Sequence, residues 1–392
     1  MHRPLLLNQV AGPLFRELAA DLAHELGAVT LATGHARDFA RALPEAVEVR
    51  AGPDYDRRSN VRRAWSWLRF FFFALGEVWR SDPASPLLIV SNPPFLPLVG
   101  WLAAFFRRQP YAILIYDFYP GLLERMGNIS TNGWIAKLWR RFNRHTWLRA
   151  RLLIAIGEHM AANVRRELPA GGPPVHVISN WVDTGFIRPL AKAENEFARR
   201  HRQQEVRTVL YAGNLGHTHD LDPLLNAAAA MRDRTDWKFL IVGEGARRET
   251  IARRVEQERL SNVTLLPFQP ESELPQLLAT GDVAVVTFLP GVEGYIVPSK
   301  TYYSLAAGSA LLVLARHPNE VSDLVARAQC GVTIDPQNSA GIVEWLEHCG
   351  RDPELLQRCR RQARAAAEMY FGRTANTAAY AALFRKLSRD TR

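Results

Sequence analysis

Short apolar runs alternate with amphipathic stretches along nearly the whole chain. The runs are rich in Leu, Ile and Val and are apolar at consecutive positions, which predicts buried strands, while the stretches between them have helical spacing. Strands that are apolar on both faces indicate parallel sheets covered by helices. The predicted strands are residues 5–8, 28–32, 87–90, 112–116, 152–156 and 175–178, and then 208–211, 238–242, 263–266, 283–286, 310–314 and 331–334.

The strand series restarts after residues 181–194, a segment that contains Pro189 and has no strong periodicity. A length of 392 residues also exceeds a single typical core, so we expect two doubly wound α/β domains, at 1–185 and 195–370. Arg- and Ala-rich helices follow, and a break at 370–372 divides them. The last segment, 371–392, could cap the second sheet, but we favour a helix that crosses back to the first domain.

The net charge of +10 is concentrated in the first half, where residues 1–185 carry 22 Lys and Arg against 15 Asp and Glu. This excess favours an anionic partner, such as a membrane surface or a phosphate-bearing substrate. Nucleic acid is not expected, because no helix-turn-helix, zinc-finger or RNP pattern accompanies the charge.

The three cysteines fall late in the chain without metal-ligand spacing, which is typical of incidental thiols in a reducing compartment. The first apolar run is too short for a signal peptide, and no run reaches the roughly 18–20 residues that a membrane span needs. A cytoplasmic protein is therefore expected.

The segment FLPGVEGYIVPSKTYYSLAAG, residues 288–308, is the first candidate site. It leads from a predicted strand through a Gly-flanked loop into a helix, the place where α/β proteins hold phosphates. Lys300 would add a mobile cation and Glu293 could accept hydrogen bonds from sugar hydroxyls, so a nucleoside diphosphate sugar suits the pattern. The alternative is an ordinary connection with two surface charges.

A second candidate follows the first strand of the later domain, in YAGNLGHTHDLDPLL, residues 211–225. Gly213 and Gly216 would let the backbone approach a ligand closely, and His217 and His219 could contact phosphate. The glycines could also serve turn geometry alone. A further glycine pair in VGEG, residues 242–245, favours the site interpretation.

Two short acidic pairs match a pattern that holds divalent metals in some sugar transferases. Asp220 and Asp222 precede a proline that opens a helix, which is typical of N-capping, and Asp54 and Asp56 lie in a loop beside arginines. We favour these structural interpretations and predict no required metal, since no other cluster has ligand spacing.

Asp117 ends a predicted buried strand in ILIYDFYPGLL. A carboxylate at that edge could bond an acceptor hydroxyl or transfer a proton, or it could cap the turn before Pro120. Glu158 stands at a similar strand end, where capping is the better interpretation.

Two aromatic segments with basic flanks, 66–80 and 92–110, are too short to span a bilayer. Both contact with a membrane interface and packing against the first sheet remain open.

Seven segments in order, SNPPFLPLVGWL, IYDFYP, VISNWVD, YAGNLG, VGEG, LLPFQPESELPQLLATGDVAVV and EGYIVPSKTYYSLAAG, resemble the family-4 glycosyltransferases of the GT-B fold. The likeness is to bacterial enzymes of exopolysaccharide, capsule and O-antigen assembly and covers essentially the whole chain. It implies two Rossmann-like domains facing each other across a cleft, with the acceptor in the first and the nucleotide sugar in the second. It also implies hexosyl transfer with retention of configuration and without metal or cofactor.

Carried over by position, the resemblance implies that most site residues lie in the second domain. Asn214 would join the diphosphate site with the two glycines beside it, Gly243 and Glu244 would add to it, and Ser299 and Lys300 would face the phosphates. The loop Glu293, Gly294 and Tyr295 would meet the donor sugar, with Phe268 near the base. The sequence departs from the family at Tyr303, where a ribose-binding Glu is common, at His217, where a basic residue is common, and at the reduced Gly-rich loop Ala11-Gly12-Pro13.

The expected protein is thus a retaining, metal-independent transferase with Asp117, Glu293 and Lys300 as catalytic candidates. Its acceptor would be lipid-linked or a saccharide, with peripheral contact to the inner face of an anionic membrane. Two alternatives stay open: a sugar-nucleotide epimerase on the same fold, and a catalytically silent relative that binds a partner. A Rossmann oxidoreductase is disfavoured because no full G-x-G-x-x-G follows a predicted strand.

Overall fold

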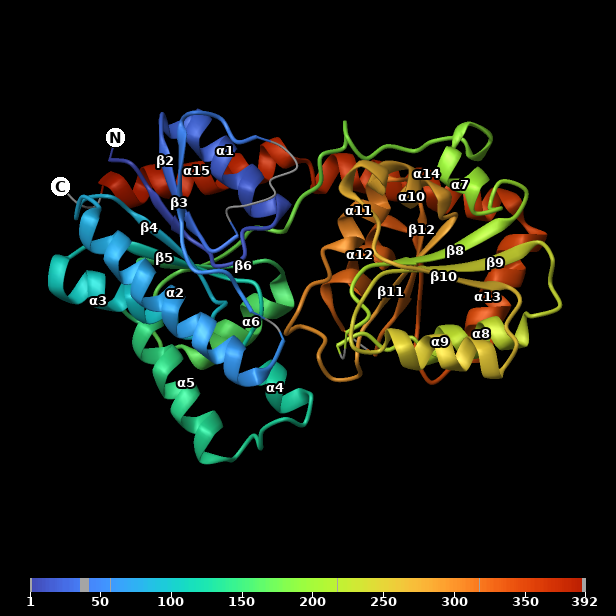
Figure 1. The fold of residues 1–392 in the computed structure, drawn as a ribbon, viewed down its shortest axis with the longest axis horizontal. Coiled ribbons are helices and arrows are strands. Elements are labelled where there is room, and N and C mark those ends of the chain that lie inside the picture. The colour runs from blue at the N-terminus through green and yellow to red at the C-terminus, as the bar shows by residue number, and fades with distance from the viewer. Residues whose placement is uncertain (1, 36–41, 57, 217, 317, 390–392) are drawn as a thin grey trace. The chain divides into compact units, whose positions relative to one another are not determined.

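The computed structural model describes residues 2–35, 42–56, 58–216, 218–316 and 318–389. It contains two compact units, each built on one parallel sheet with helices on both faces (Figure 1). The first unit comprises Met1–Asn180 and the C-terminal segment from Thr374, and the second comprises Trp181–Arg373. The predicted α/β class with two Rossmann-like sheets is confirmed.

The sheet of the first unit has the strand order β3-β2-β1-β4-β5-β6-β7 and is parallel throughout. The order reverses between β1 and β4, so the two connections that leave these strands diverge at the carboxyl edge. The central strands are wholly apolar and buried. The strands are β1 (Leu5–Leu7), β2 (Val29–Thr33), β3 (Val47–Ala51), β4 (Leu87–Val90), β5 (Tyr111–Ile115), β6 (Leu152–Ala155) and β7 (Val175–Val177).

Helices α1 and α15 lie along one face of this sheet, and α2, α3 and α5 lie along the other (Figure 1). Ser59 begins α2, where its side chain accepts a hydrogen bond from the backbone N–H of Arg62 and satisfies a donor that the helix leaves unpaired. The helices are α1 (Pro13–Leu26), α2 (Asn60–Arg80), α3 (Pro97–Arg107), α4 (Gly121–Arg125), α5 (Trp134–Trp147), α6 (Glu158–Glu167) and α15 (Arg373–Arg389).

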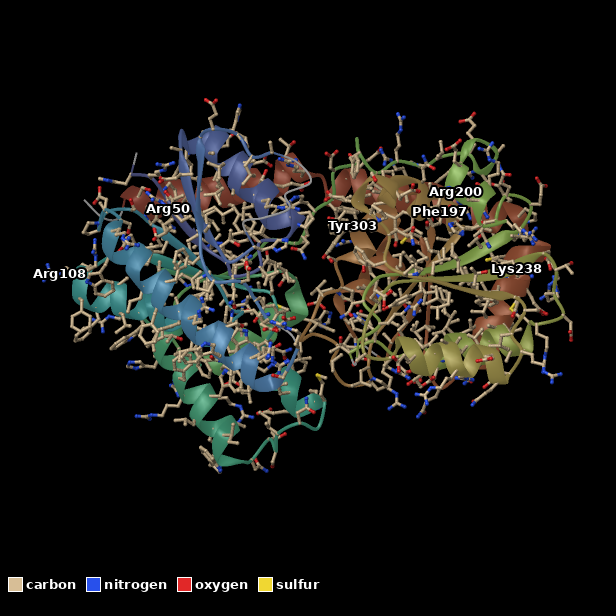
Figure 2. All side chains as sticks on the ribbon, viewed as in Figure 1. Arg50, Arg108, Phe197, Arg200, Lys238 and Tyr303 are labelled. Carbon is tan, nitrogen blue, oxygen red and sulfur yellow. The ribbon has the colours of Figure 1, made fainter. Side chains whose placement is uncertain are left out.

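Strand β3 is absent from the sequence prediction. It is an edge strand in which Val47 is buried and charged residues alternate outward, so its apolar content is low. Arg50, on β3 in Figure 2, pairs with Glu48 and approaches Glu77 of α2. Charged side chains on an edge strand discourage pairing with another chain.

The second sheet has the order β10-β9-β8-β11-β12-β13, is also parallel, and reverses between β8 and β11. Helices α8, α9 and α13 cover one face, while α10, α11, α12 and α14 cover the other (Figure 1). The strands are β8 (Arg207–Ala212), β9 (Trp237–Val242), β10 (Val263–Leu266), β11 (Val283–Thr287), β12 (Ala310–Leu314) and β13 (Gly331–Ile334). The helices are η1 (Lys192–Glu194), α7 (Glu196–Arg200), α8 (Asp222–Ala230), α9 (Arg248–Gln257), η2 (Glu271–Glu273), α10 (Leu274–Thr280), α11 (Lys300–Ala306), α12 (Glu320–Ala328), α13 (Ser339–Arg351) and α14 (Pro353–Tyr370).

The last two helices separate at Phe371, close to the predicted break. Within the second unit, the guanidinium of Arg364 on α14 donates to the carbonyl oxygens of Thr184, Ile187 and Ala306, which ties the segment after residue 181 to this helix. Helix α15 packs in the first unit, where Tyr380 and Phe384 are buried and Arg385 pairs with Glu25 of α1.

Among the described residues, each helix is too short or too polar to cross a membrane. The three cysteines are buried and free. Each aromatic segment has one helix face in the core and one on the surface, so packing against the first sheet is confirmed for the buried face, while membrane contact stays a prediction. Phe70 and Val99 are buried, whereas Phe72 and Phe106 are more than 60% exposed.

Candidate functional site

The loops that follow β8, β9 and β11 meet at the carboxyl edge of the second sheet, where its strand order reverses. Open α/β sheets bind ligands at such a point, because the connections on either side turn to opposite faces. Two hydrogen bonds join the loop after β8 to the end of β11 and its loop: Leu289 N–H donates to Thr218 O at 2.8 Å, and the Thr287 hydroxyl donates to Asp220 O at 2.6 Å. The structure therefore brings together the two segments that the sequence singled out.

The two glycine loops lie backbone against backbone. A Cβ atom at Gly243 would stand 1.9 Å from the carbonyl oxygen of Gly213, so no larger residue fits there without displacing the β8 loop. Gly213 N–H donates to Val242 O at 2.9 Å, and Leu215 N–H donates to Glu244 O at 2.8 Å. These contacts fix the course of the loops and leave Asn214 and Glu244 exposed at their tips.

Lys300 extends beneath the Gly213 loop. Its Nζ lies 3.8 Å from the centroid of the Tyr211 ring and would be 3.9 Å from a Cβ at Gly213. The residue as a whole is half-buried, but Nζ is enclosed and has no hydrogen-bond partner among the described residues. Burial lowers the Lys300 pKa to about 7, because the charged form loses its water without gaining an acceptor.

An enclosed ammonium group without an acceptor is unfavourable in an isolated protein. An anionic ligand at this position would supply the missing acceptor and favour the protonated amine. The sequence predicted that Lys300 and Gly213 serve one site, and they lie together, but it did not identify Tyr211. The ring of Tyr211 holds Nζ in place, and its hydroxyl donates to Asn214 O at 2.7 Å.

His219 lies behind this lysine and is not a second cation. Burial and the nearby charge of Lys300 lower its pKa to about 3, so the ring is neutral at physiological pH. Nδ1 lies 3.0 Å from Thr287 O, and because a carbonyl oxygen only accepts, Nδ1 is assigned the proton. His217, the other predicted phosphate contact, lies outside the described residues.

Glu293 accepts hydrogen bonds from backbone groups on two loops. Its Oε2 accepts from Gly291 N–H at 2.6 Å, and its Oε1 accepts from Arg316 N–H, beyond β12, at 3.0 Å. The carboxylate thus fixes the loop that contains Gly294 and Tyr295, with Gly294 at a φ of 75°. Each oxygen has a second lone pair, so further hydroxyl donors can still bind.

Helix α11 is only seven residues long, and its first-turn amides are partly occupied. Thr301 N–H donates to Pro298 O and Tyr302 N–H donates to Ser299 O. The helix end therefore offers an anion less than the sequence suggested, and the cation of Lys300 is the main feature. Ser299 is exposed before the helix, and Tyr303 is half-buried on it (Figure 2). Phe268, after β10, is 71% exposed.

Arginines hold both carboxylates of the acidic pair Asp220 and Asp222. Arg247 Nη1 lies 3.1 Å from Asp220 Oδ1, and its Nη2 lies 2.6 Å from Asp222 Oδ2, while Arg254 also donates to Asp222. Among the described residues, no three His, Cys, Asp or Glu side chains gather in a way that could hold a metal ion.

In the first unit, Asp117 follows β5 and is half-buried. Burial raises the pKa of its carboxyl group to about 6, so the carboxylate is still the main form at neutral pH. The Ser91 hydroxyl donates to the backbone oxygen of Asp117 at 3.3 Å and accepts from Tyr116 N–H at 3.2 Å, which fixes the strand end. Next to it lies a hollow of about 100 Å³ between the ends of β1, β4 and β5, lined by Asn8, Gln9, Val10, Tyr55, Trp67, Val90, Asn92, Pro93 and Tyr116.

Two family models match the chain. Residues 192–366 match the model described as glycosyl transferases group 1, and residues 8–181 match the model described as a glycosyl transferase 4-like domain. Their boundaries fall in the two units of the structure.

Individual proteins are similar at low identity. WbjE of Pseudomonas aeruginosa, a glycosyltransferase by name, is 23% identical over 295 residues, which are 74% of this chain and 73% of WbjE. WcaI of Escherichia coli K12, by name a colanic acid biosynthesis glycosyl transferase, is 27% identical over 192 residues, which are 48% of this chain and 46% of WcaI. The solved structure of HepE from Anabaena in complex with UDP and glucose superposes with a TM-score of 0.74 at 17% identity, covering 98% of this chain and 100% of HepE. This likeness identifies the GT-B fold.

Proposed function

This chain belongs to the group 1 glycosyltransferases, and from that premise we propose that it is a retaining, metal-independent hexosyltransferase that needs no cofactor. The second unit binds a nucleoside diphosphate sugar, and the first binds a lipid-linked or saccharide acceptor. The relative named for colanic acid biosynthesis and the resemblance of the motifs support a role in cell-surface polysaccharide assembly.

The observation that carries this proposal is the enclosed amine of Lys300. Its Nζ lacks an acceptor among the described residues and lies under the glycine loop at the strand-order reversal. A diphosphate there would accept from Nζ and from backbone N–H groups of the glycine loops. HepE, which has the same fold, was crystallised with UDP and glucose, so UDP sugars are the first donors to test.

Lys300 would stabilise the diphosphate most strongly while the bond between the donor sugar and the diphosphate breaks. Transfer forms a bond between the acceptor oxygen and the anomeric carbon and breaks the bond between that carbon and the diphosphate oxygen. Negative charge then grows on the diphosphate, and a cation already placed beside it stabilises this charge without reorganisation. Glu293 and the loop through Tyr295 would hold the sugar, with Asn214, Gly216, Glu244 and Ser299 around the diphosphate and Phe268 and Tyr303 toward the nucleoside.

Asp117 would serve the acceptor. Its pKa of about 6 leaves a carboxylate at neutral pH that accepts a hydrogen bond from the attacking hydroxyl. Exposed aromatic residues on the same unit favour peripheral contact with the cytoplasmic face of an anionic membrane, because Trp79, Phe105 and Phe106 stand among arginines on α2 and α3.

The test is a thermal-shift screen of nucleoside diphosphates and their sugars on the full chain, followed by Lys300→Ala. The screen should find at least one nucleotide that raises the melting temperature, since a bound ligand stabilises the folded state. Lys300→Ala should abolish that shift and reduce turnover by about a hundredfold or more. Lys238→Ala, on strand β9 of the same unit, is the matched control and should keep both the nucleotide-induced thermal shift and the turnover of wild type.

The two alternatives give different results. An epimerase would interconvert the nucleotide sugar when no acceptor is present. A silent binding protein would take up none of the nucleotides. Unchanged activity after EDTA treatment would support the metal-independent proposal, and loss of activity that Mg²⁺ or Mn²⁺ restores would overturn it.

A further inference from the structure

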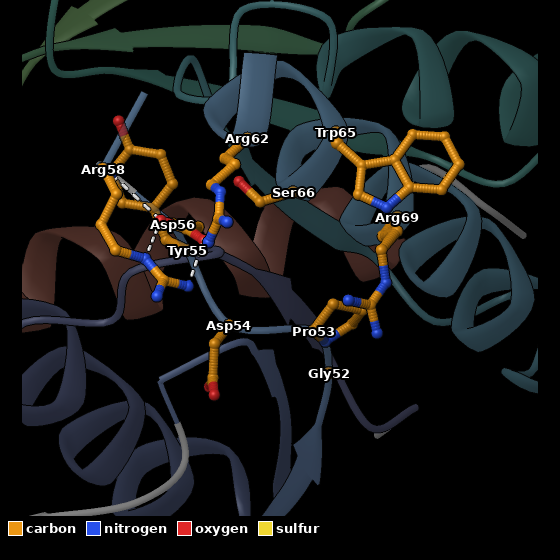
Figure 3. A pocket seen from close by; sticks show the side chains of 10 residues that line it. All are labelled: Gly52, Pro53, Asp54, Tyr55, Asp56, Arg58, Arg62, Trp65, Ser66 and Arg69. Atoms are coloured by element: carbon orange, nitrogen blue, oxygen red, sulfur yellow. Dashed lines mark hydrogen bonds and ion pairs between the residues drawn. The ribbon is translucent and has the colours of Figure 1, made fainter. Parts of the chain in front are cut away.

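A pocket of about 870 Å³ opens in the first unit between the loop after β3 and the first turns of α2. Figure 3 shows Arg62 and Arg69 reaching from the helix toward the loop, Arg62 beside Asp56 and Arg69 beside Pro53. The volume lies in the range of small-molecule sites. The lining residues are Gly52, Pro53, Asp54, Tyr55, Asp56, Arg58, Arg62, Trp65, Ser66 and Arg69.

The three arginines of this pocket differ in how far they are neutralised. Arg58 holds Asp56 with two side-chain bonds of 3.0 and 2.7 Å, and this pairing lowers the pKa of Asp56 to about 2. Arg62 makes a longer ion pair with the same carboxylate, at 3.8 Å, so it shares one negative charge with Arg58, and Arg69 has no ion pair or hydrogen bond with any described residue. Arg69 is therefore open to an anion and Arg62 is incompletely neutralised, whereas Asp54 points away from both in Figure 3.

These two arginines project from one side of α2, because they are seven residues apart, or two turns. A phosphodiester carries one negative charge, whereas a diphosphate diester carries two. One open and one incompletely neutralised guanidinium group therefore fit a diphosphate better than a single phosphate.

An apolar stripe borders this arginine pair. Viewed down the axis of α2, with 100° of rotation per residue, five exposed apolar side chains fall within an arc of about 60°. Arg62 and Arg69 lie on the flank of this stripe next to Trp65. The stripe extends over about 27 Å of helix at 1.5 Å per residue. Its members are Val61, Trp65, Leu68, Phe72 and Trp79, each at least 44% exposed. A charged pocket beside a long apolar stripe matches a diphosphate joined to a lipid chain.

The pocket also continues toward the proposed acceptor site. Tyr55 lines both this pocket and the small hollow at the ends of β1, β4 and β5, next to Asp117. In that hollow, the Gln9 side chain is 1% exposed and its Oε1 has no partner among the described residues, although its Nε2 donates to Ser66 O at 3.0 Å. An enclosed acceptor of this kind suits a sugar hydroxyl.

We propose that Arg62 and Arg69 bind the diphosphate of a lipid-linked acceptor, whose lipid chain lies along the exposed stripe of α2 and whose sugar enters the hollow near Gln9. The inference rests on the proposed transferase function and specifies its acceptor. It predicts that diphosphate and lipid are recognised by one helix, so both parts of the acceptor contribute to binding.

The test uses the full chain and farnesyl diphosphate, a soluble prenyl diphosphate, in isothermal titration calorimetry. Wild-type protein should bind it, Arg62→Gln and Arg69→Gln should each weaken binding by about tenfold, and the double variant should weaken it further. Arg80→Gln, at the far end of the same helix, is the matched control and should bind as wild type. Trp65→Ala should weaken farnesyl diphosphate but not inorganic diphosphate.

Several outcomes would overturn the inference. If the double variant binds farnesyl diphosphate as tightly as wild type, or if wild type does not bind it, this pocket is not the diphosphate site. Arginine-dependent binding to phosphatidylglycerol vesicles that farnesyl diphosphate cannot displace would instead identify a membrane headgroup site. The thermal shift with UDP separates this result from the donor proposal, because it depends on Lys300 in the other unit. If no nucleotide shifts the melting temperature while prenyl diphosphate still binds, the transferase proposal fails and the pocket remains.

Discussion

Lys300→Met should stabilise the ligand-free protein while it abolishes donor binding. Met fills a similar volume and removes the enclosed charge. The drop in the Lys300 pKa from 10.5 to about 7 costs the folded state up to about 5 kcal/mol, at about 1.4 kcal/mol per pKa unit, and roughly 4 kcal/mol at pH 7, where half of the amines are already neutral. The cation–π contact with Tyr211 offsets about 2 kcal/mol of this cost. A net gain of about 2 kcal/mol remains for the variant.

The sign of the pH dependence follows from the same values. Because the folded-state pKa lies below the unfolded-state pKa, the cost of burying the amine is complete below about pH 7 and disappears as the pH rises toward 10.5. The variant should therefore exceed wild type in melting temperature by about 4–8 °C at pH 6–7, and the difference should narrow by pH 10. Wild type should also take up protons when it binds UDP, since the phosphates raise the Lys300 pKa.

Differential scanning calorimetry of both proteins between pH 6 and pH 10 without ligand measures this difference, and UDP titration in buffers of different ionisation enthalpy measures the proton uptake. Lys238→Met is the control, because the Lys238 Nζ reaches a carbonyl oxygen at the surface, Ser261 O at 3.5 Å. A lower melting temperature for Lys300→Met at pH 7, or a difference that does not change with pH, would refute the reasoning.

Three further predictions concern single residues. Asp117→Asn should reduce kcat/KM. Protonation of Asp117 predicts that wild type loses activity below about pH 6, and pH–rate profiles should show that the variant lacks this loss. An unchanged loss of activity at acid pH in the variant would contradict this role. Gly243→Ala should destabilise the second unit by about 2–4 kcal/mol and weaken UDP binding, because its Cβ would collide with Gly213 O; calorimetry checks both. In Glu293→Gln the side chain has one acceptor oxygen, so it can accept from only one of the two backbone N–H groups that the carboxylate now holds. The KM for the donor should rise about tenfold while the melting temperature changes little. A normal KM would remove Glu293 from the donor site.

The sequence was sufficient to predict the central strands of both sheets, because these strands are runs of mostly apolar, buried residues, a pattern that few other structures share. The same reasoning explains why Lys300 and Gly213 could be assigned to one site. Their loops follow neighbouring parallel strands, and the carboxyl ends of such strands meet at one edge. Edge strand β3 was missed because two of its five residues are charged and little of it is buried.

The contacts made by side chains across the fold could not be predicted. Tyr211 lies inside an apolar run, where an aromatic residue is expected in the core, and only the structure shows that its ring faces the Lys300 amine. Glu293 was expected to meet a sugar, but its backbone partner at Arg316 belongs to a loop beyond the next strand. The arginine pocket was divided between two predicted segments, since helix α2 begins at Asn60 whereas the aromatic segment was assigned from residue 66.

The contrast between two buried charges in the second unit supports a functional role for Lys300. Asp282 is also buried, but Lys192, Arg360 and the backbone N–H of Thr208 all donate to its carboxylate, so its charge is fully compensated within the fold. Such a group needs no ligand, and its neighbours explain its presence. Lys300 has an aromatic ring in place of an acceptor, and the free energy that this arrangement costs is recovered only when an anion binds. A chain that keeps one buried charge fully paired and leaves another open, at the edge where the sheet reverses, has the properties of a binding site rather than of a packing fault.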